Sequence, residues 1–327
     1  MVDQVAGAKT ISWKVPTEPE AVRLDAFVRR CLPHLSRREV DKAITDKLFV
    51  VNGRVGKKGQ RLTSGADVVF TGPVNWLAER PQPAAEFDIP IIYQDAALIA
   101  LDKRAGVATH GFSARDGITA ANFIATRWPE LLQVGKSRWE PGLVHRLDIE
   151  TSGLLLAAKT NAAFDHLRDQ FRRREIGKTY WALVWGETDG AGEIALPLAH
   201  DSRDRRRMRV AEATKNAAHQ RVWPALTRYR KLGFAQGVSL LEIEMATGVT
   251  HQIRVHLAAL GHAIIGDGLY GAAHDERFGL QRHFLHAMGL EFNHPTDGHM
   301  LKLTAPLAPE LAEVLRRLGI NYSAARL

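Results

Sequence analysis

Residues 141–160, PGLVHRLDIETSGLLLAAKT, limit the possible fold and chemistry of this chain more than any other stretch. The run Leu154-Leu155-Leu156 is short, continuous and preceded by polar residues and a glycine, which predicts a buried β-strand. Asp148 stands at the mouth of that strand, beside the cationic Arg146. A neighbouring cation keeps a carboxylate ionised and fixes its direction. Asp148 is therefore a candidate nucleophile, and a structural ion pair with Arg146 is the alternative.

The composition is that of a folded protein with a polyanionic partner. The 327 residues suffice for one large domain and a small one, and 45% of them are hydrophobic. The formal net charge of +8 favours nucleic acid as the partner. The single cysteine, Cys31, excludes a disulfide framework, falls on the apolar face of a predicted helix and fits a reducing cytosol. With no signal peptide and no apolar run of membrane-spanning length, we expect a cytoplasmic monomer with no membrane partner.

The positive charge is concentrated near the N-terminus, where residues 21–62 carry a net charge of +7. Apolar side chains recur there at helical spacing, and Ser36 and Glu39 have the spacing of a capping box that begins a second helix. An Asn-Gly pair within residues 49–55 predicts a two-residue hairpin turn. The outer side of the second helix carries cations that we predict to contact RNA, a solvated face being the alternative: Arg37, Arg38 and Lys42.

A proline-rich stretch separates this basic segment from the rest of the chain. Residues 71–90 hold four prolines and little periodic pattern, which predicts an extended tether, part of which can instead pack on the following domain. The expected organisation is an N-terminal tail (1–20), a small module (21–70), the linker (71–90) and a large domain (91–327).

The large domain interleaves strands and helices irregularly, with strands in the majority. Residues 91–93 and 98–103 predict a hairpin, and residues 180–185 and 240–245 alternate as strands do. This order favours an α+β fold with a mixed, largely antiparallel central sheet and flanking helices over a doubly wound sheet. No glycine-rich phosphate loop is present.

One helix of the large domain is predicted over residues 251–260. Thr250 is expected to cap its N-terminus, and Gly261 suits its C-terminus. Its inner face is expected to consist of Ile253, Leu257 and Leu260.

Several stretches of the large domain resemble, in order and spacing, the motifs of the RluA-type pseudouridine synthases. They are residues 101–111 (LDKRAGVATHG), the HRLD string that ends in Asp148, residues 178–186 (KTYWALVWG), residues 246–271 (ATGVTHQIRVHLAALGHAIIGDGLYG) and, more weakly, residues 294–307. The basic segment, with LSRREV followed by VVNGRV, resembles the S4 RNA-binding domain. The resemblance implies a pseudouridine synthase fold preceded by a small S4-like α/β module.

The resemblance also implies a reaction, the isomerisation of uridine in RNA to pseudouridine. The N1–C1′ bond breaks, the uracil turns, and C5 bonds to C1′ without redox change, so no cofactor is expected. The family pattern makes Asp148 the catalytic carboxylate, which could attack the base or the sugar, or stabilise a glycal-type intermediate. It makes Arg254 the partner that orients Asp148, with a bidentate pair as one possible geometry. Tyr180 would stack on the uracil, although a hydroxyl with a pKa of about 10 is a poor base at neutral pH.

Further residues are expected to contact the RNA. A target uridine in folded RNA must leave its stack, and the resemblance implies that Arg146 fills the gap. Residues 201–210, DSRDRRRMRV, predict a basic loop that is either a phosphate clamp or simply solvated. The structural alternatives for the catalytic set are a core tyrosine at 180 and a structural ion pair at 254. Substrate contacts are also predicted for His145, Thr250 and Gln252.

Other functions remain to be weighed against this one. Glycoside hydrolysis also breaks an anomeric bond but needs a second carboxylate opposite Asp148, and Glu150 is too near in sequence to serve. The scattered histidines lack cysteine partners and an HExxH string, so no metal site is predicted. By family resemblance, the S4-like segment favours large-subunit ribosomal RNA as the substrate. Transfer RNA, or an inactive RNA-binding or ribosome-assembly protein, is the alternative.

Three departures from the family's usual strings bear on the target. Arg104, Ile149 and Val249 stand where proline, a basic residue and arginine are common. None removes an assigned catalytic group. Lost cations alter phosphate contacts. The target uridine of a particular family member is therefore not assigned to this chain.

Overall fold

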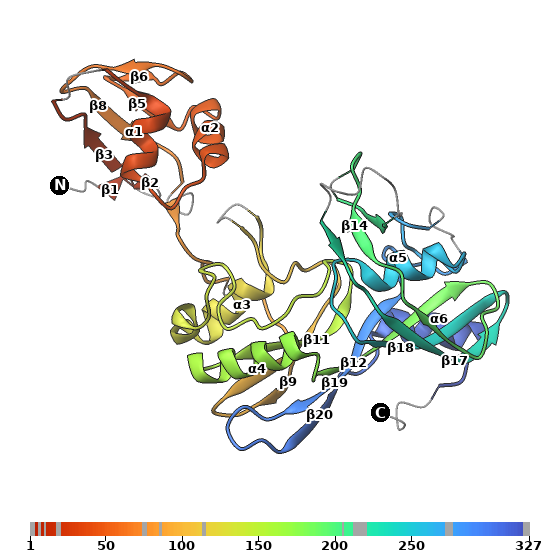
Figure 1. The fold of residues 1–327 in the computed structure, drawn as a ribbon. Coiled ribbons are helices and arrows are strands. Elements are labelled where there is room, and N and C mark those ends of the chain that lie inside the picture. Colours follow the sequence, from red (N-terminus) through yellow and green to blue (C-terminus); the bar gives the residue numbers. More distant parts are fainter. Residues whose placement is uncertain are drawn as a thin grey trace. The chain divides into compact units, whose positions relative to one another are not determined.

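The computed structural model describes residues 4–5, 8–9, 11–17, 21–73, 77–84, 87–112, 116–204, 206–211, 221–271 and 277–322. The chain divides into two compact units, Met1–Gln82 with Phe112–Gly117, and Pro83–Gly111 with Ile118–Leu327 (Figure 1). No helix in the described ranges combines the length and the apolar composition needed to cross a bilayer.

The smaller unit is an α/β module built on a four-stranded antiparallel sheet. Its helices are α1 (Leu24–Cys31) and α2 (Arg37–Thr45). The sheet order is β3 (Ile11–Lys14), β8 (Asp67–Phe70), β5 (Phe49–Val51) and β6 (Arg54–Val55). Two further pairs are β4 (Val22–Arg23) with β7 (Arg61–Leu62), and β1 (Gln4–Val5) with β2 (Ala8–Lys9).

The prediction of a tail over residues 1–20 is wrong for β3. Ile11 pairs with Phe70 and Lys14 with Asp67, so this segment is a strand of the sheet. The reason is local, because the side chain of Trp13 packs against the apolar core of the unit.

The local signals in the basic segment are confirmed. Ser36 accepts a hydrogen bond from the Glu39 N–H, and the Glu39 carboxylate accepts one from the Ser36 N–H, which completes the capping box. Asn52 and Gly53 both have positive φ, 47° and 77°, as a two-residue hairpin turn between β5 and β6 requires. The cations expected on the outer side of α2 are exposed: Arg37, Arg38 and Lys42.

The larger unit is built on a nine-stranded sheet, and among its described strands only the β11–β19 pair is parallel. The predicted α+β class with a mixed, largely antiparallel sheet is therefore confirmed. The strands follow the order β13 (Ala191–Ile194), β17 (Thr227–Ala235), β18 (Val238–Met245), β12 (Gly177–Trp185), β19 (Leu285–Asn293), β11 (Ser152–Ala158), β10 (Leu98–Lys103) and β9 (Ile91–Gln94), with β20 (Met300–Thr304) also on β19.

Shorter elements complete the larger unit. A small antiparallel sheet has the order β15 (Met208–Val210), β14 (Leu198–His200) and β16 (Val222–Trp223). The helices are α3 (Ala120–Arg127), α4 (Asn161–Arg173), α5 (Gln252–Ala259) and α6 (Pro309–Leu318), with a 3₁₀ turn at Pro129–Gln133.

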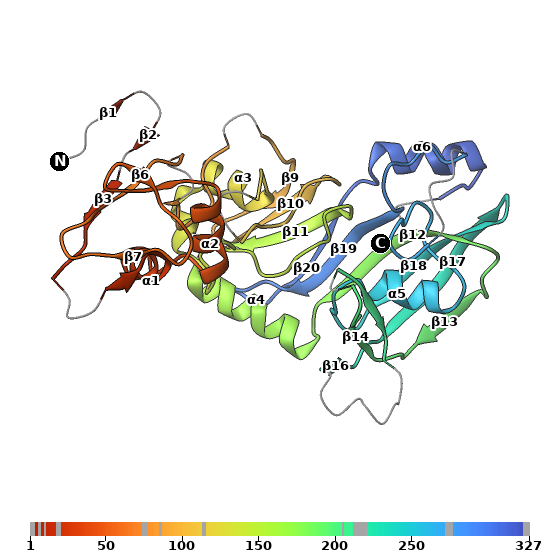
Figure 2. The same cartoon turned by 90° about the horizontal axis from the view of Figure 1, so that it is seen from above.

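Two apolar cores lie along the large sheet and meet at β19. One core joins β10 and β11 to α3 and α4, and it includes Leu290 of β19. The other joins β12 and β18 to α5 and α6, and it includes Leu285 and Ala287 of β19. Figure 2 shows α4 beside the first half of the sheet and α5 and α6 beside the second. The loop before β11, which carries Asp148, therefore lies where the two halves join.

The prediction for the helix after β18 is partly wrong. Thr250 does not cap α5, because His251 takes the N-cap position in a left-handed conformation (φ 55°) and no side chain caps the helix. Leu260 is 43% exposed, since the chain leaves the helix there and turns at Gly261 (φ 84°). Ile253 and Leu257 are buried, as expected.

The proline-rich linker is shorter than residues 71–90. Leu77 packs against the core of the smaller unit, whereas Phe87 and Ile89 pack into the first core of the larger unit. The Pro90 carbonyl accepts a hydrogen bond from the Asp102 N–H at 2.8 Å. Part of the stretch thus packs on the following domain, which was the alternative to a free tether.

Candidate active site

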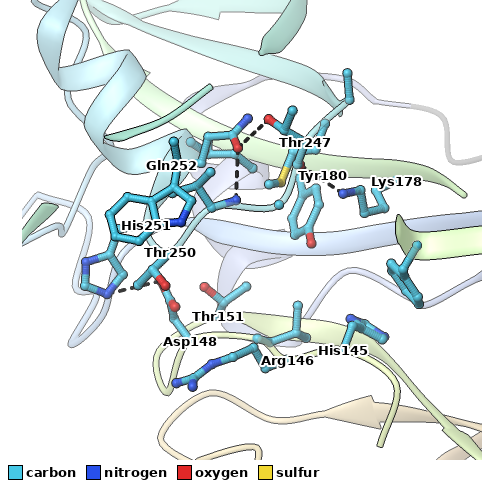
Figure 3. Close-up of a pocket in the computed structure, with 18 of the residues that line it drawn as sticks. His145, Arg146, Asp148, Thr151, Lys178, Tyr180, Thr247, Thr250, His251 and Gln252 are labelled. Atoms are coloured by element: carbon cyan, nitrogen blue, oxygen red, sulfur yellow. Dashed lines mark hydrogen bonds and ion pairs between the residues drawn. The ribbon is translucent and has the colours of Figure 1, made fainter. Parts of the chain in front are cut away.

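A cavity of about 540 Å³ opens in the larger unit around Asp148. Its walls come from the loop before β11, the C-terminal end of α4, Lys178 and Tyr180 of β12, and residues 245–254. Tyr180, Asp148 and Arg146 face the same space (Figure 3). A volume of this size is typical of a small-molecule or flipped-nucleotide site.

The loop that carries Asp148 is tied to the sheet on both sides. Upstream, the Nε2 atom of His145 accepts a hydrogen bond from the Leu156 N–H at 2.9 Å, and its ring stacks on Phe171. Burial lowers the pKa of His145 to about 3, so the ring is neutral and able to accept that bond. Nearer to Asp148, the Leu147 N–H donates to the Thr109 hydroxyl at 3.0 Å, and that hydroxyl donates to the Leu147 carbonyl at 2.8 Å.

On its other side the loop is held by a buried lysine. The Nζ atom of Lys103 donates to the carbonyls of Arg104, Val107 and Ile149 at 2.9, 2.8 and 3.1 Å. Burial lowers the pKa of Lys103 to about 7. Because Ile149 follows Asp148 directly, these contacts leave the carboxylate little freedom to move.

Arg254 reaches the carboxylate from α5, as predicted, but the geometry differs from a bidentate pair. Its Nη1 atom donates a single hydrogen bond to Asp148 Oδ2 at 3.2 Å. The fork of the guanidinium, Nε and Nη2, instead binds both oxygens of Asp267 at 2.7 and 2.8 Å. Asp267 is fully buried, and Arg254 holds the pKa of that carboxyl below its usual range despite the burial. Asp267 therefore orients the arginine, and the arginine orients Asp148.

His251 forms a second contact with the carboxylate. Its Nε2 atom lies 3.7 Å from Asp148 Oδ2, and its Nδ1 atom lies 2.7 Å from the hydroxyl of Tyr270. Burial lowers the pKa of His251, which keeps the ring neutral at neutral pH. Figure 3 shows the imidazole beside Asp148 at the edge of the cavity.

Tyr180 provides the aromatic wall of the site. It lies on β12, two residues from Lys178 and therefore on the same face of the strand. The side chain is 7% exposed, and burial together with the charge of Asp148 raises the pKa of its hydroxyl. The hydroxyl thus stays protonated at neutral pH, which suits a stacking surface or a hydrogen-bond donor rather than a base.

The mouth of the cavity is cationic. Arg172 and Arg174, at the end of α4, are exposed and line it. Lys178 donates to the Thr247 carbonyl at 2.9 Å, and burial lowers its pKa to about 8. Arg168 is already engaged, since its guanidinium donates to the Val144 carbonyl at 3.0 Å. These charges suit an anionic ligand.

The structure separates the predicted substrate contacts into two kinds. Arg146 and Thr250 are exposed at the cavity and are available to a ligand. His145 has its Nε2 atom committed to the backbone of β11. Gln252 is 1% exposed; its Oε1 accepts from Thr247 and from the Val249 N–H, and its Nε2 donates to Leu226 and Thr227. These contacts fit a residue that holds the 247–252 turn, not the RNA contact expected of it.

Some residues that shape the site carried no role in the sequence interpretation. Asp267, Tyr270 and His251 fall within the quoted stretch 246–271, but their contacts join residues 13 to 103 positions apart. The one signal in the sequence is the aspartate of GDGLYG, a charged residue that follows the apolar pair Ile264-Ile265.

One group in the described part of the chain could bring three metal-ligand atoms within 4.8 Å, namely His294, Asp297 and His299. It lies in the turn between β19 and β20, and both imidazoles bind one Asp297 oxygen, at 3.0 and 2.6 Å. Hydrogen bonds thus account for this arrangement.

In the basic loop predicted over residues 201–210, residue 205 lies outside the described residues, and Asp204 pairs with Arg206.

Comparisons with known proteins agree with one another. A family model described as RNA pseudouridylate synthase matches residues 97–259, and an S4 domain model matches residues 22–68. An uncharacterized RNA pseudouridine synthase of Chloroflexus aurantiacus is 38% identical over 93% of this chain and 92% of its own. The ribosomal large subunit pseudouridine synthase D of Nitrosomonas europaea is 33% identical over 94% of this chain and 88% of its own. The solved structure of human RNA pseudouridylate synthase domain containing 4 matches with a TM-score of 0.56 and 25% identity, over 71% of this chain and 94% of that one.

Proposed function

The chain belongs to the family of RNA pseudouridylate synthases, and from this premise we propose that it acts on uridines of large-subunit ribosomal RNA. It is an RNA pseudouridine synthase, an isomerase, with an N-terminal S4 domain that binds RNA. Two observations support the ribosomal target. The Nitrosomonas europaea relative is named for the large ribosomal subunit, and it aligns with 94% of this chain, S4 segment included.

The observation that carries the proposed chemistry is the placement of Asp148. Its carboxylate faces a cavity, is 23% exposed, and receives a hydrogen bond from Arg254 at 3.2 Å. A fixed cation aims the carboxylate at whatever enters the cavity. Asp148 is therefore the proposed catalytic carboxylate, which acts on the flipped nucleotide while the N1–C1′ bond breaks and C5 bonds to C1′. The reaction is completed when C5 loses its proton and N1 gains one.

Tyr180 and the cationic rim complete the proposed site. The Tyr180 ring offers a flat surface for the uracil, and its protonated hydroxyl can donate a hydrogen bond to a carbonyl of the base. Arg146 is exposed beside Asp148 and is proposed to fill the space that the flipped nucleotide leaves. Arg172 and Arg174 are placed to contact flanking phosphates.

The proposal is tested by mapping pseudouridines in total RNA from cells with and without this protein. Specific sites in large-subunit ribosomal RNA should disappear without it and return when the wild-type chain is supplied. The Asp148→Asn variant should restore none of them while still binding RNA. Asp189→Asn, an exposed aspartate outside the site, is the matched control and should restore all of them.

Three results would overturn the proposal in different ways. Loss of pseudouridine in transfer RNA alone would move the target. Normal modification by Asp148→Asn would remove Asp148 from the chemistry, and an unchanged RNA map would leave a binding protein without this activity.

A further inference from the structure

Tyr270 holds together parts of the larger unit that are far apart in sequence. Its hydroxyl accepts a hydrogen bond from the N–H of Met208, the first residue of β15, at 2.7 Å. The same hydroxyl lies 2.7 Å from Nδ1 of His251. Two guanidinium groups contact its ring, with Arg254 at 5.1 Å and Arg207 at 5.3 Å from the centroid.

The direction of the hydrogen bonds follows from the donors available. The Met208 N–H can only donate, so it occupies a lone pair of the phenol oxygen and leaves the phenol proton free. That proton can be donated to His251 Nδ1, because the neutral imidazole has one acceptor nitrogen. The other nitrogen, Nε2, then carries the ring proton. Nε2 is the atom of His251 that lies 3.7 Å from Asp148 Oδ2.

A second path runs from Tyr270 through Arg254. The backbone N–H of Tyr270 donates to Asp267 Oδ1 at 3.2 Å, and the same oxygen accepts from Arg254 Nη2 at 2.8 Å. The Tyr270 ring also covers the guanidinium, a favourable contact for a planar cation. Tyr270 therefore supports both of the side chains that approach the Asp148 carboxylate.

We propose that Tyr270 is a positioning residue for Asp148. Tyr270 fixes His251 and Arg254, and it is itself anchored on the β14–β15 hairpin. The hydroxyl selects the His251 tautomer that presents an N–H to the carboxylate. The ring packs against the guanidinium of Arg254 and limits its movement. Arg207 and Met208 are thereby joined to the Asp148 carboxylate through Tyr270. The inference rests on the proposed catalytic role of Asp148.

The test is a double-mutant cycle with the purified full chain and a ribosomal RNA substrate. Tyr270→Phe keeps the ring and removes the hydroxyl. His251→Asn tolerates the left-handed backbone, but its side chain is too short to reach Asp148. Each single variant should lower kcat by about tenfold, the rate equivalent of one hydrogen bond, while the Kd for RNA stays within about twofold. The double variant should be no slower than His251→Asn alone, because both changes break the same chain of contacts.

The matched control is Tyr93→Phe, which also removes a tyrosine hydroxyl hydrogen bond, here to Asp95 at 2.7 Å, in a strand away from the cavity. It should leave kcat unchanged. Additive losses in the double variant, or an unchanged kcat in Tyr270→Phe, would overturn the inference while Asp148→Asn remained inactive. A loss of RNA affinity with normal kcat would also overturn it, since Tyr270 would then only anchor the hairpin. If Asp148→Asn were active, the proposed function itself would fail first.

Discussion

At the scale of single residues, the resemblance to family motifs predicted which side chains share the site but not how they are paired. Asp148, Tyr180 and Arg254 were predicted from the motifs that carry them, and all three line one cavity. The bidentate partner of Arg254 is Asp267, which no spacing rule identified. Such a pairing is decided by how the turn after α5 folds back, and this depends on the tertiary structure rather than on local sequence.

The first residue-scale prediction concerns the Arg254 fork. Arg254→Lys keeps a positive charge, but one ammonium group cannot bind both oxygens of Asp267 and still reach Asp148. We expect kcat to fall by roughly a hundredfold, which is a loss of about 3 kcal/mol in transition-state stabilisation. Single-turnover kinetics measure this. Arg230→Lys, at an exposed pair with Glu242, is the control, and a near-native rate for Arg254→Lys would contradict the positioning role.

A second prediction concerns the stability of the loop anchored by His145. The pKa of this half-buried imidazole is about 3 in the fold, below its unfolded value of about 6.5, so the unfolded chain binds the extra proton between these values. The stability contributed by neutral His145 is present above pH 6.5 and is lost as the pH falls toward 3, by at most about 1.4 kcal/mol per pH unit. His145→Gln can still accept the Leu156 N–H bond but does not titrate. Denaturant unfolding at several pH values should therefore show a shallower acid slope for this variant, and an equal slope would contradict the assignment.

At the scale of elements, local patterning predicted most strands and the hairpin turn, because period and turn chemistry are properties of neighbouring residues. It did not predict that β11 pairs in parallel with β19, since Ser152 and His286 are far apart in sequence. It also misplaced the start of α5. Thr250 has the chemistry of a cap, but His251 takes the N-cap position and turns the chain into the helix with a positive φ.

The parallel pair leads to the element-scale prediction. Gly153 has φ +109°, and a Cβ atom there would collide with the backbone carbonyl of Ala287 on β19. Gly153→Ala should therefore lower the free energy of unfolding by about 2–4 kcal/mol through strain and separation of the strands. Gly190→Ala is the control, because nothing lies within 4 Å of its added Cβ. Chemical denaturation of both variants measures the difference, and equal stabilities would mean that β11 and β19 can separate at no cost.

At the scale of the whole molecule, charge distribution was the most informative property of the sequence. The excess of Lys and Arg over Asp and Glu in residues 21–62 nearly equals that of the entire chain. The S4 domain match covers residues 22–68. The structure places three of these cations on the exposed side of α2, but Lys42 is also 3.0 Å from Asp46. Exposed pairs of this kind are weak, so Lys42 remains available to a phosphate.

The molecule-scale prediction is that the S4 unit supplies affinity and the larger unit supplies chemistry. Removing residues 1–82 leaves Phe87 and Ile89 in the core of the larger unit, so the remainder should fold. Its affinity for ribosomal RNA should drop and the salt dependence of binding should become shallower, because fewer counterions are released. Replacing Arg37, Arg38 and Lys42 by glutamine in the full chain should reduce the slope of log K against log salt by roughly 2–3, about 0.7–0.9 per lost contact. Short uridine-containing RNA should still react with the truncated protein. An unchanged affinity and salt slope in both proteins would mean that the exposed face of α2 is only solvated and that the larger unit binds the RNA by itself.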